Sequence, residues 1–435
     1  MSKKNPIKPS KLYKITKHAV YSIDVKLPKA TKVSSNVELK QVGNQKFVPF
    51  GDDNNHPAVI RDGYIYMSPV LIASIRYKSS LMVGQGVYAA KITGYTKNGE
   101  EILEAVIDDE INQFLNNKNF NSYLGKASYN LQAYGNLFPE LILNEPKTKI
   151  LRISEKSTVN SRWGTNKDGK IESILLMPDW MEIDEEKMKI IPTLDVDNPL
   201  VDLEERKNKL TSFGYINSNY SFNYYNLPDF ESAINSKWIN LSLKTPAFLD
   251  AAYENAFSGL FHVQIPIEWI DYTFPADNWE DDQDRLDEID KFLDEFDKDM
   301  TTPGNSKKSL TNIGVPDSEG KNIYWKVDEI KNSSNFTKEI LANDAADNQL
   351  TTTFLINDAV FLRKTSSGMG AGSGSDILNA HLINISMLKN PRDAIMEPIE
   401  LIRDFNGWNQ NIVFRFRDTI LTTLDTNSPT DTVVM

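Results

Sequence analysis

The spacing of apolar and polar residues divides the first third of the chain into helices and strands. Residues 70–83 carry apolar side chains at helical spacing, with Ser68 in the N-cap position and Pro69 at the first helical position. The glycine-rich step at 84–86 ends this helix, and a strand begins at Val87. Two more helices are predicted, over 101–115 and 122–134.

Extended segments follow. Residues 135–143 read as a turn that enters a strand, and further strands are predicted over 150–153 and 170–176 around a polar turn at 166–169. Residues 184–226 look polar and irregular. Helices and strands in this arrangement predict an α+β fold.

The rest of the chain returns to long helices separated by short extended segments. In order, the pattern predicts a helix over 229–253 that Pro246 kinks, a strand over 260–267, an acidic helix over 277–299, a strand over 322–327, a helix over 334–354 capped by Ser334, a helix from Asp376 broken at Pro391 and Pro398, and a strand over 411–417. Ordered structure is expected to begin near Phe47.

A glycine- and serine-rich run separates the last two long helices. It lacks the Gly-Lys-Ser/Thr ending of a P-loop, and its alternating glycines do not follow the strand-to-helix turn of a dinucleotide site. Because each glycine loses much backbone freedom when ordered, we interpret the run as a flexible loop. The functional alternative is a loop that contacts DNA in a pore. The candidate residues for this contact are Arg363, Lys364, Ser366, Ser367, Gly368, Gly370, Gly372 and Gly374.

The acidic helix over 277–299 carries one apolar stripe, formed by Leu286, Ile289, Phe292, Leu293 and Phe296. Its other faces are coated with aspartate and glutamate. A solvated amphipathic helix is one interpretation, and a docking face for a basic partner is the other. The docking candidates are Asp281, Asp282, Asp284, Asp287, Glu288 and Asp294.

Composition narrows the function classes. The 435 residues are 40% hydrophobic, which is enough for a sizeable core. The absence of cysteine excludes disulfides and thiolate chemistry, and the four histidines are never at the spacing of a helical metal site. We find no Gly-x-Ser-x-Gly elbow and no other catalytic motif, so we expect neither an enzyme nor a metal or other cofactor.

Charge is distributed unevenly. The formal net charge is −12, yet residues 1–46 contain eleven lysines against Asp24 and Glu38, a charge of +9, which leaves −21 for the remainder. The basic start reads either as a solvated tail or as a strap that contacts nucleic acid, scaffold or a neighbouring subunit. It lacks the apolar core of a signal peptide, and no run is long enough to span a bilayer, so we expect neither secretion nor membrane insertion.

The order of several short motifs resembles that of a known family. The motifs are FGDDNNHP at 50–57, SPVLIASI at 68–75, MVGQGV at 82–87, AYGNLF at 133–138, YNLPD at 225–229 and ENAFSG at 254–259. Together with the acidic helix and the Gly/Ser run, they resemble the portal proteins of tailed bacteriophages over residues 47–417. Each motif alone is weak, and their order carries the resemblance.

The resemblance implies a portal-like architecture. The implied parts are a basic arm (1–46), an α+β wing (47–227), a stem helix (228–258), a small α/β clip (259–328), a second stem helix (329–356), a tunnel loop (357–375), a long helix with the return strand of the wing (376–417) and a C-terminal tail or vestigial crown (418–435). Because the chain ends soon after Arg417, where many portals add helices, we expect a short or absent crown.

The resemblance also implies a function and partners. Portal subunits form a homo-oligomeric ring of twelve copies at one capsid vertex, where terminase large subunit drives double-stranded DNA through the channel. The other implied partners are the major capsid protein, scaffold and a head-tail adaptor, and the implied location is the virion, after assembly in the host cytoplasm. Two alternatives stay open: a non-portal structural or adaptor protein of a viral assembly, and an enzyme acting on nucleic acid.

Overall fold

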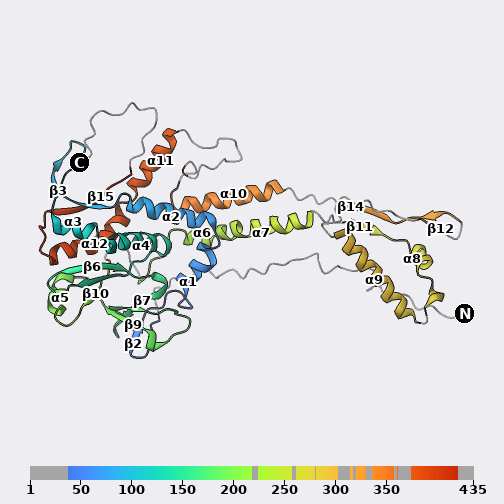
Figure 1. Cartoon of the computed structure of the whole chain (residues 1–435), viewed down its shortest axis with the longest axis horizontal. Coiled ribbons are helices and arrows are strands. Elements are labelled where there is room, and N and C mark those ends of the chain that lie inside the picture. Colours follow the sequence, from blue (N-terminus) through green and yellow to red (C-terminus); the bar gives the residue numbers. More distant parts are fainter. Residues whose placement is uncertain are drawn as a thin grey trace.

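The computed structural model describes residues 38–217, 224–256, 261–279, 281–301, 314–316, 320–329, 336–356, 360 and 374–419. These residues form an α+β body, a pair of helices that projects from it, and a smaller group of elements at the far end of that pair (Figure 1). We call the helix pair α7 (Trp238–Ala256) and α10 (Phe336–Thr353) the arm, and the elements between Phe261 and Glu329 the distal unit.

The elements follow one another along the chain as β1 (Lys40–Val42), β2 (Gln45–Phe47), α1 (His56–Ile60), the π-helix η2 (Arg61–Ile65), α2 (Pro69–Val83), β3 (Val87–Tyr95), β4 (Glu101–Ala105), α3 (Asp109–Leu115), α4 (Lys118–Tyr134), β5 (Pro139–Leu143), β6 (Ile150–Glu155), η3 (Thr158–Asn160), β7 (Ser161–Thr165), β8 (Ile171–Leu176), η4 (Glu185–Lys187), β9 (Lys189–Pro192), α5 (Pro199–Arg206), β10 (Ser212–Gly214), α6 (Glu231–Asn235), α7, β11 (Phe261–Gln264), α8 (Ile267–Thr273), η5 (Ala276–Asn278), α9 (Asp282–Thr301), β12 (Val315–Pro316), β13 (Asn322–Ile323), β14 (Lys326–Glu329), α10, α11 (Gly374–Ser386), α12 (Lys389–Phe405) and β15 (Ile412–Phe416).

Three antiparallel sheets build the body. Their strand orders are β1-β2-β7-β8-β9, β10-β5-β6 and β15-β3-β4. The main core lies where α4 packs against β6 and α12, and Phe120, Tyr123 and Ile399 are almost completely buried there. The Tyr123 hydroxyl donates a hydrogen bond to the Ile395 carbonyl at 2.7 Å, which ties α4 to α12. Residues far apart in the sequence therefore share one core.

The Asp/Asn-rich turn before α1 is fixed by hydrogen bonds from a buried side chain of the body. Arg162 on β7 is fully buried, and its guanidinium donates to the Asn54 side-chain oxygen at 2.7 Å and to the Asn54 carbonyl at 2.6 Å. Asn54 adopts a positive φ of 57°, a conformation that asparagine tolerates better than most residues. Burial lowers the pKa of Arg162 to about 10, so its side chain is still charged at neutral pH.

The elements of the body agree with the sequence pattern over α2, β5, β6, β8 and β15. The helix predicted over 101–115 is wrong in its first part, because Glu101–Ala105 is strand β4 and pairs with β3; the helix proper is α3. Order begins earlier than Phe47, since β1 and β2 already belong to the five-stranded sheet. The segment 184–226, expected to be irregular, contains β9, α5 and β10.

Two long helices are also interrupted differently from the prediction. The helix expected over 229–253 is divided into α6 and α7 at Lys237, whose φ is 67°, and α7 continues through Pro246. The helix from Asp376 ends at Ser386 and not at Pro391 or Pro398. Pro391 lies in the first turn of α12, where a helix does not need its missing N–H, and Pro398 lies inside α12. Helix α8 was not expected.

Candidate functional site: the arm, its base and its acidic end

The arm is anchored in a second core of the body. Phe230, which precedes α6, stacks on Phe354 at the end of α10 with 5.7 Å between ring centroids. Leu350 of α10 is fully buried in the same cluster, beside Ile75 of α2. The root of the arm is therefore continuous with the packing of the body.

Further out, polar groups join the two helices of the arm. The Ser242 hydroxyl of α7 donates to the Asp347 carboxylate of α10 at 2.7 Å, and Asn343 donates to the same carboxylate at 3.3 Å. Ala346 is fully buried beside this link, which lets the helices approach closely. A helix pair of this kind needs a fixed register, and the hydrogen bond from Ser242 supplies it.

The outer surface of the arm carries large apolar side chains. Leu241 and Phe248 of α7 and Ile340 and Leu341 of α10 are all exposed, with Phe248 48% exposed. Leu355, which follows α10, is also exposed and has a φ of 54°. Single exposed apolar residues are common, but several on one narrow projection are typical of a surface that another chain covers.

The motif at 133–138 joins the body to the arm. Gly135 ends α4 with a φ of 72°, and Asn136 both accepts a hydrogen bond from the Asn226 N–H and donates to the Asn226 carbonyl, at 2.9 Å and 2.8 Å. A Cβ at Gly135 would lie 3.0 Å from the Leu227 carbonyl oxygen. Glycine and asparagine at these positions are therefore required by the close approach of the segment that enters the arm.

A groove of about 450 Å³ opens at the base of the arm, between the ends of α4 and α10 and the junction of α11 and α12. Lys78 is buried at its edge and donates to the Asn384 side chain at 2.8 Å. Burial lowers the pKa of Lys78 and raises the pKa of Asp229, which also lines the groove. Each group favours the charged form of the other, since Lys78 lowers the pKa of Asp229 and Asp229 raises that of Lys78.

The distal unit has its own small aromatic core. Trp269 of α8 lies edge-on to Trp325 with 4.7 Å between centroids, and Phe292 and Phe296 of α9 pack on the same indole at 5.6 Å and 5.0 Å. The antiparallel pair β11–β14 lies beside these helices at the far end of the arm (Figure 1). The predicted apolar stripe of the acidic helix is thus confirmed as its packing face, apart from Leu286, which is exposed.

The predicted docking residues lie on or next to α9. Helix α9 has nine acidic and three basic residues, a formal charge of −6. Lys291 forms an ion pair with Glu288 at 3.0 Å, and Arg285 pairs with Asp271 at 2.6 Å, so part of the charge is balanced locally. Glu288 is half-buried, and the exposed candidates are Asp281, Asp282, Asp284, Asp287 and Asp294.

Of the predicted loop candidates, Gly374 lies within the described residues, and it is not near α9. Gly374 is the first residue of α11, which lies against the body, whereas α9 lies at the far end of the arm (Figure 1). The other loop candidates, Arg363, Lys364, Ser366, Ser367, Gly368, Gly370 and Gly372, lie outside the described residues.

Sequence reasoning missed several buried charged side chains, among them Lys78, Glu155 and Arg162. Lys78 lies on the buried face of the predicted helix 70–83, so its position along the helix could have predicted its burial. Arg162 lies in β7, which is buried on both faces, and Glu155 lies at a buried position of β6, where Arg152 is exposed; only the assembled sheets reveal these burials.

The described residues offer neither a metal site nor a membrane span. The described residues contain no group of three or more histidine, aspartate or glutamate side chains that could hold a metal ion. Asp195 pairs with Lys170 at 2.6 Å and accepts hydrogen bonds from the Asp197 and Asn198 N–H groups. Within the described part of the chain, every helix is too short or too polar to cross a bilayer.

Comparison with known proteins yields similarity of fold only. No family model matches the sequence, and no curated protein matches it. The fold is similar to that of a chain in the virion of the native gene transfer agent (GTA) particle, with a TM-score of 0.52, 9% identity and 86% of each chain covered. It is equally similar to a chain in the neck of the empty GTA particle, computed with C6 symmetry, with a TM-score of 0.52, 10% identity and 86% of each chain covered.

Proposed function

We propose that this chain is a portal subunit, one copy of a ring at a capsid vertex through which DNA is packaged by terminase and later ejected. The observation that carries the proposal is the arm: two antiparallel helices distant in sequence project from an α+β body and end in a separate small unit (Figure 1). The fold likeness to chains of a virion and of a neck, over 86% of each chain, supports the same assignment.

Each part of the structure then has a role. The body, from 47–227 and 376–417, is the wing; 228–258 and 329–356, which contain α6, α7 and α10, are the stem. The distal unit falls within the clip, 259–328, and 357–375 is the tunnel loop. Residues 1–46 remain the basic N-terminal segment in this scheme, and 418–435 a tail or vestigial crown.

The exposed apolar residues of the stem fit a ring. In a closed ring each subunit uses two different faces, so one stem covers the next and no apolar edge is left open. We propose twelve copies, a number compatible with the C6 symmetry of the neck that contains the similar chain.

The negative net charge of the chain supports a role as a channel for DNA. Phosphate binds to lysine and arginine, so a wall with few of them lets DNA slide. Transient contact is assigned to the tunnel loop, mainly to Arg363 and Lys364, and the further contact candidates are Ser366, Ser367, Gly368, Gly370, Gly372 and Gly374.

The acidic surface of α9 is assigned to docking. Five exposed aspartates at or beside the free end of the stem offer a surface for a basic face of terminase large subunit during packaging, and of the head-tail adaptor afterwards. The body is assigned to contact with the major capsid protein and scaffold.

Imaging of the purified full chain by negative stain tests the ring directly. We expect rings with a central hole, and we expect Phe248→Glu to abolish them because it places a charge in the covered stem surface. The control is Ile107→Glu, an exposed apolar residue of the body that is 91% exposed and lies away from the arm. A persistent monomer in varied salt, or rings that survive Phe248→Glu, would contradict the assignment.

The tunnel loop is tested in packaged heads. Arg363→Gln with Lys364→Gln should reduce DNA retention, because it removes the two positive charges assigned to phosphate contact. Neutralisation of two exposed lysines of the body, Lys97 and Lys118, is the charge-matched control. Retention equal to that of the wild type would remove the DNA contact from this loop.

A non-portal structural protein of the same kind of particle is the second candidate. It is favoured by the fold likeness to a chain of a neck, a region whose chains need not all be portals. This candidate would be selected if the purified chain assembles into rings and DNA is still packaged into heads that lack the chain. An enzyme acting on nucleic acid has no comparable support.

A further inference from the structure

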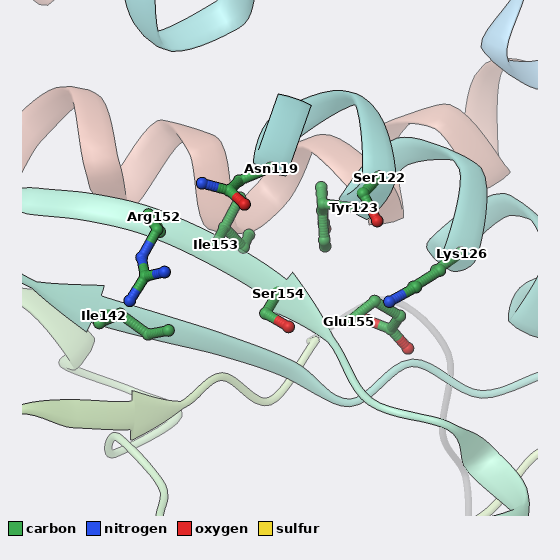
Figure 2. A pocket seen from close by; sticks show the side chains of 9 residues that line it. All are labelled: Asn119, Ser122, Tyr123, Lys126, Ile142, Arg152, Ile153, Ser154 and Glu155. Atoms are coloured by element: carbon green, nitrogen blue, oxygen red, sulfur yellow. The ribbon is translucent and has the colours of Figure 1, made fainter. Parts of the chain in front are cut away.

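A small polar pocket of about 160 Å³ lies in the body between α4 and β6 (Figure 2). Helix α4 contributes Asn119, Ser122 and Lys126, whose i, i+3, i+7 spacing places them on one face of the helix. Strand β6 contributes Arg152, Ser154 and Glu155. No role in the proposed ring has been assigned to this pocket.

Glu155 lies in the pocket with one satisfied and one unsatisfied oxygen. Its Oε1 accepts hydrogen bonds from the Phe138 N–H at 2.9 Å and from the Asn130 side-chain amide at 3.0 Å. Its Oε2 is buried, and among the described residues it has no hydrogen-bond partner. An ionised carboxylate left in this state would be strongly unfavourable, so the bare oxygen requires a proton or a ligand.

The protonation of Glu155 decides whether its side chain can donate a hydrogen bond in the pocket. Burial raises the pKa of Glu155 to about 8, against the smaller lowering effects of its two hydrogen bonds and of Lys156 and Lys126. At neutral pH the carboxyl group is therefore mainly protonated. Because Oε1 already accepts two donors, the proton belongs on Oε2, and Glu155 becomes a hydrogen-bond donor that lacks an acceptor.

The other charged groups around the pocket are positive. Lys126 and Arg152 are exposed at its rim, and neither forms an ion pair with any described residue. Lys156, the third cation near Glu155, is engaged by Glu140 at 2.5 Å. Tyr123 lines the pocket as a neutral phenol, because burial raises its pKa well above the usual value. Glu155 is the one acidic residue in the lining.

We propose that this pocket binds a small oxyanion, held between Lys126 and Arg152 and hydrogen-bonded by the protonated carboxyl group of Glu155. Figure 2 shows Lys126 and Arg152 at opposite ends of the lining, and cations and donors around a small pocket are the chemistry that phosphate, sulfate and carboxylate groups require. The volume admits a group of this size and excludes a nucleotide. Binding would also supply the acceptor that Glu155 lacks.

The protonation of Glu155 makes this binding depend on pH with a defined sign. Below the pKa the donor is present, and above it the carboxylate repels the anion. At about pH 9 only about a tenth of the sites are protonated, so binding weakens about tenfold relative to about pH 6.5.

Calorimetric titration of the full chain with sulfate tests the proposal, because sulfate keeps its charge over this range. The wild type should bind about tenfold more weakly at about pH 9 than at about pH 6.5. Glu155→Gln places an amide donor at the same position, so sulfate binding should persist and lose its pH dependence. Lys126→Met and Arg152→Met should weaken binding at both pH values, whereas Lys118→Met, an exposed lysine of α4 outside the pocket, should not.

Acetate titrated in parallel distinguishes a general oxyanion site, which binds both probes, from one selective for tetrahedral anions, which binds sulfate alone; either outcome supports the proposal. Equal sulfate affinity at the two pH values, or equal weakening by Lys118→Met and Arg152→Met, would overturn it. If Glu155→Gln fails to fold by circular dichroism, the wild-type pH comparison and the Arg152→Met result still decide. Failure of ring formation has no bearing on this test, since the pocket lies within one chain.

Discussion

Replacement of Gly135 by alanine should destabilise the protein, whereas the same change at Gly125, earlier in α4, should stabilise it. Gly135 has a φ of 72°, and an added Cβ would lie 3.0 Å from the carbonyl oxygen and 3.1 Å from the carbonyl carbon of Leu227. Gly125 lies inside the helix, and a Cβ there would have no atom within 4 Å. One helix therefore offers a matched pair of substitutions with opposite expected signs.

The magnitudes follow from backbone conformation and contact. Alanine in the left-handed region costs about 1–2 kcal/mol, before any contact is considered. The contact adds to this cost because Leu227 cannot move freely: Asn226 beside it is held by two hydrogen bonds to Asn136. We expect Gly135→Ala to lower the free energy of unfolding by about 2 kcal/mol or more, and Gly125→Ala to raise it by about 1 kcal/mol.

Urea unfolding followed by circular dichroism and tryptophan fluorescence measures both changes. Protein concentration must be equal for all variants, because assembly would itself stabilise the folded chain. The double variant should lie near the sum of the two, since the substituted positions share no partner. Shifts of the same sign for the two single variants, or a Gly135→Ala protein as stable as the wild type, would refute the argument that the approach of Leu227 requires glycine.

Three other changes test the contacts that shape the body and the arm. Arg162→Lys keeps the charge but cannot reproduce the three short hydrogen bonds to Asn54 and Ser161, so it should lower the free energy of unfolding by about 2 kcal/mol or more, as urea titration will measure. Ser242→Ala removes the hydrogen bond to Asp347 and should cost about 1–2 kcal/mol, whereas Ser232→Ala, at an exposed position of α6, should cost little; equal effects would argue against the polar link of the arm. The Glu155 carboxyl titrates near 4.5 when unfolded and at about 8 when folded, so its contribution should make stability fall as pH rises between these values and stay level above them; Glu155→Gln should lack this slope in urea titrations at several pH values.

Local signals in the sequence were sufficient to predict the ends of some elements. Helix α2 begins where its cap and proline predict, and the Ser68 hydroxyl accepts the Leu71 N–H at 3.2 Å. It ends at the expected glycines, with positive φ at Gly84 and Gly86. Both ends depend on residues within a few positions of each other, so tertiary contacts were not needed to predict them.

Strand β4 shows where a local signal was outweighed. Glu101–Ala105 consists of residues that favour a helix, and a helix was predicted. In the fold these residues pair with β3, and Arg415 on β15 forms an ion pair with Glu101 at 2.8 Å. The preceding Asn98-Gly99, with a φ of 83° at Gly99, is a hairpin signal that the sequence contained.

The site was predicted in outline only. The order of motifs indicated two stem helices and an acidic helix, and the structure has helices in those places. The pairing of α7 with α10, the hydrogen bond from Ser242 to Asp347 and the aromatic core under α9 join residues separated by tens of positions. The roles of the loop and docking residues remain predictions.

The sequence by itself determined the α+β class, both ends of α2, the apolar stripe of the acidic helix and the absence of thiol chemistry, because each depends on composition or on neighbours along the chain. Only the tertiary structure decided that Arg162, Lys78 and Glu155 are buried, which strands share a sheet, and that a pocket with a buried carboxyl group lies between α4 and β6. The physical reason is that burial and electrostatic environment are properties of what surrounds a side chain in space, and those surroundings come from segments far apart in the sequence.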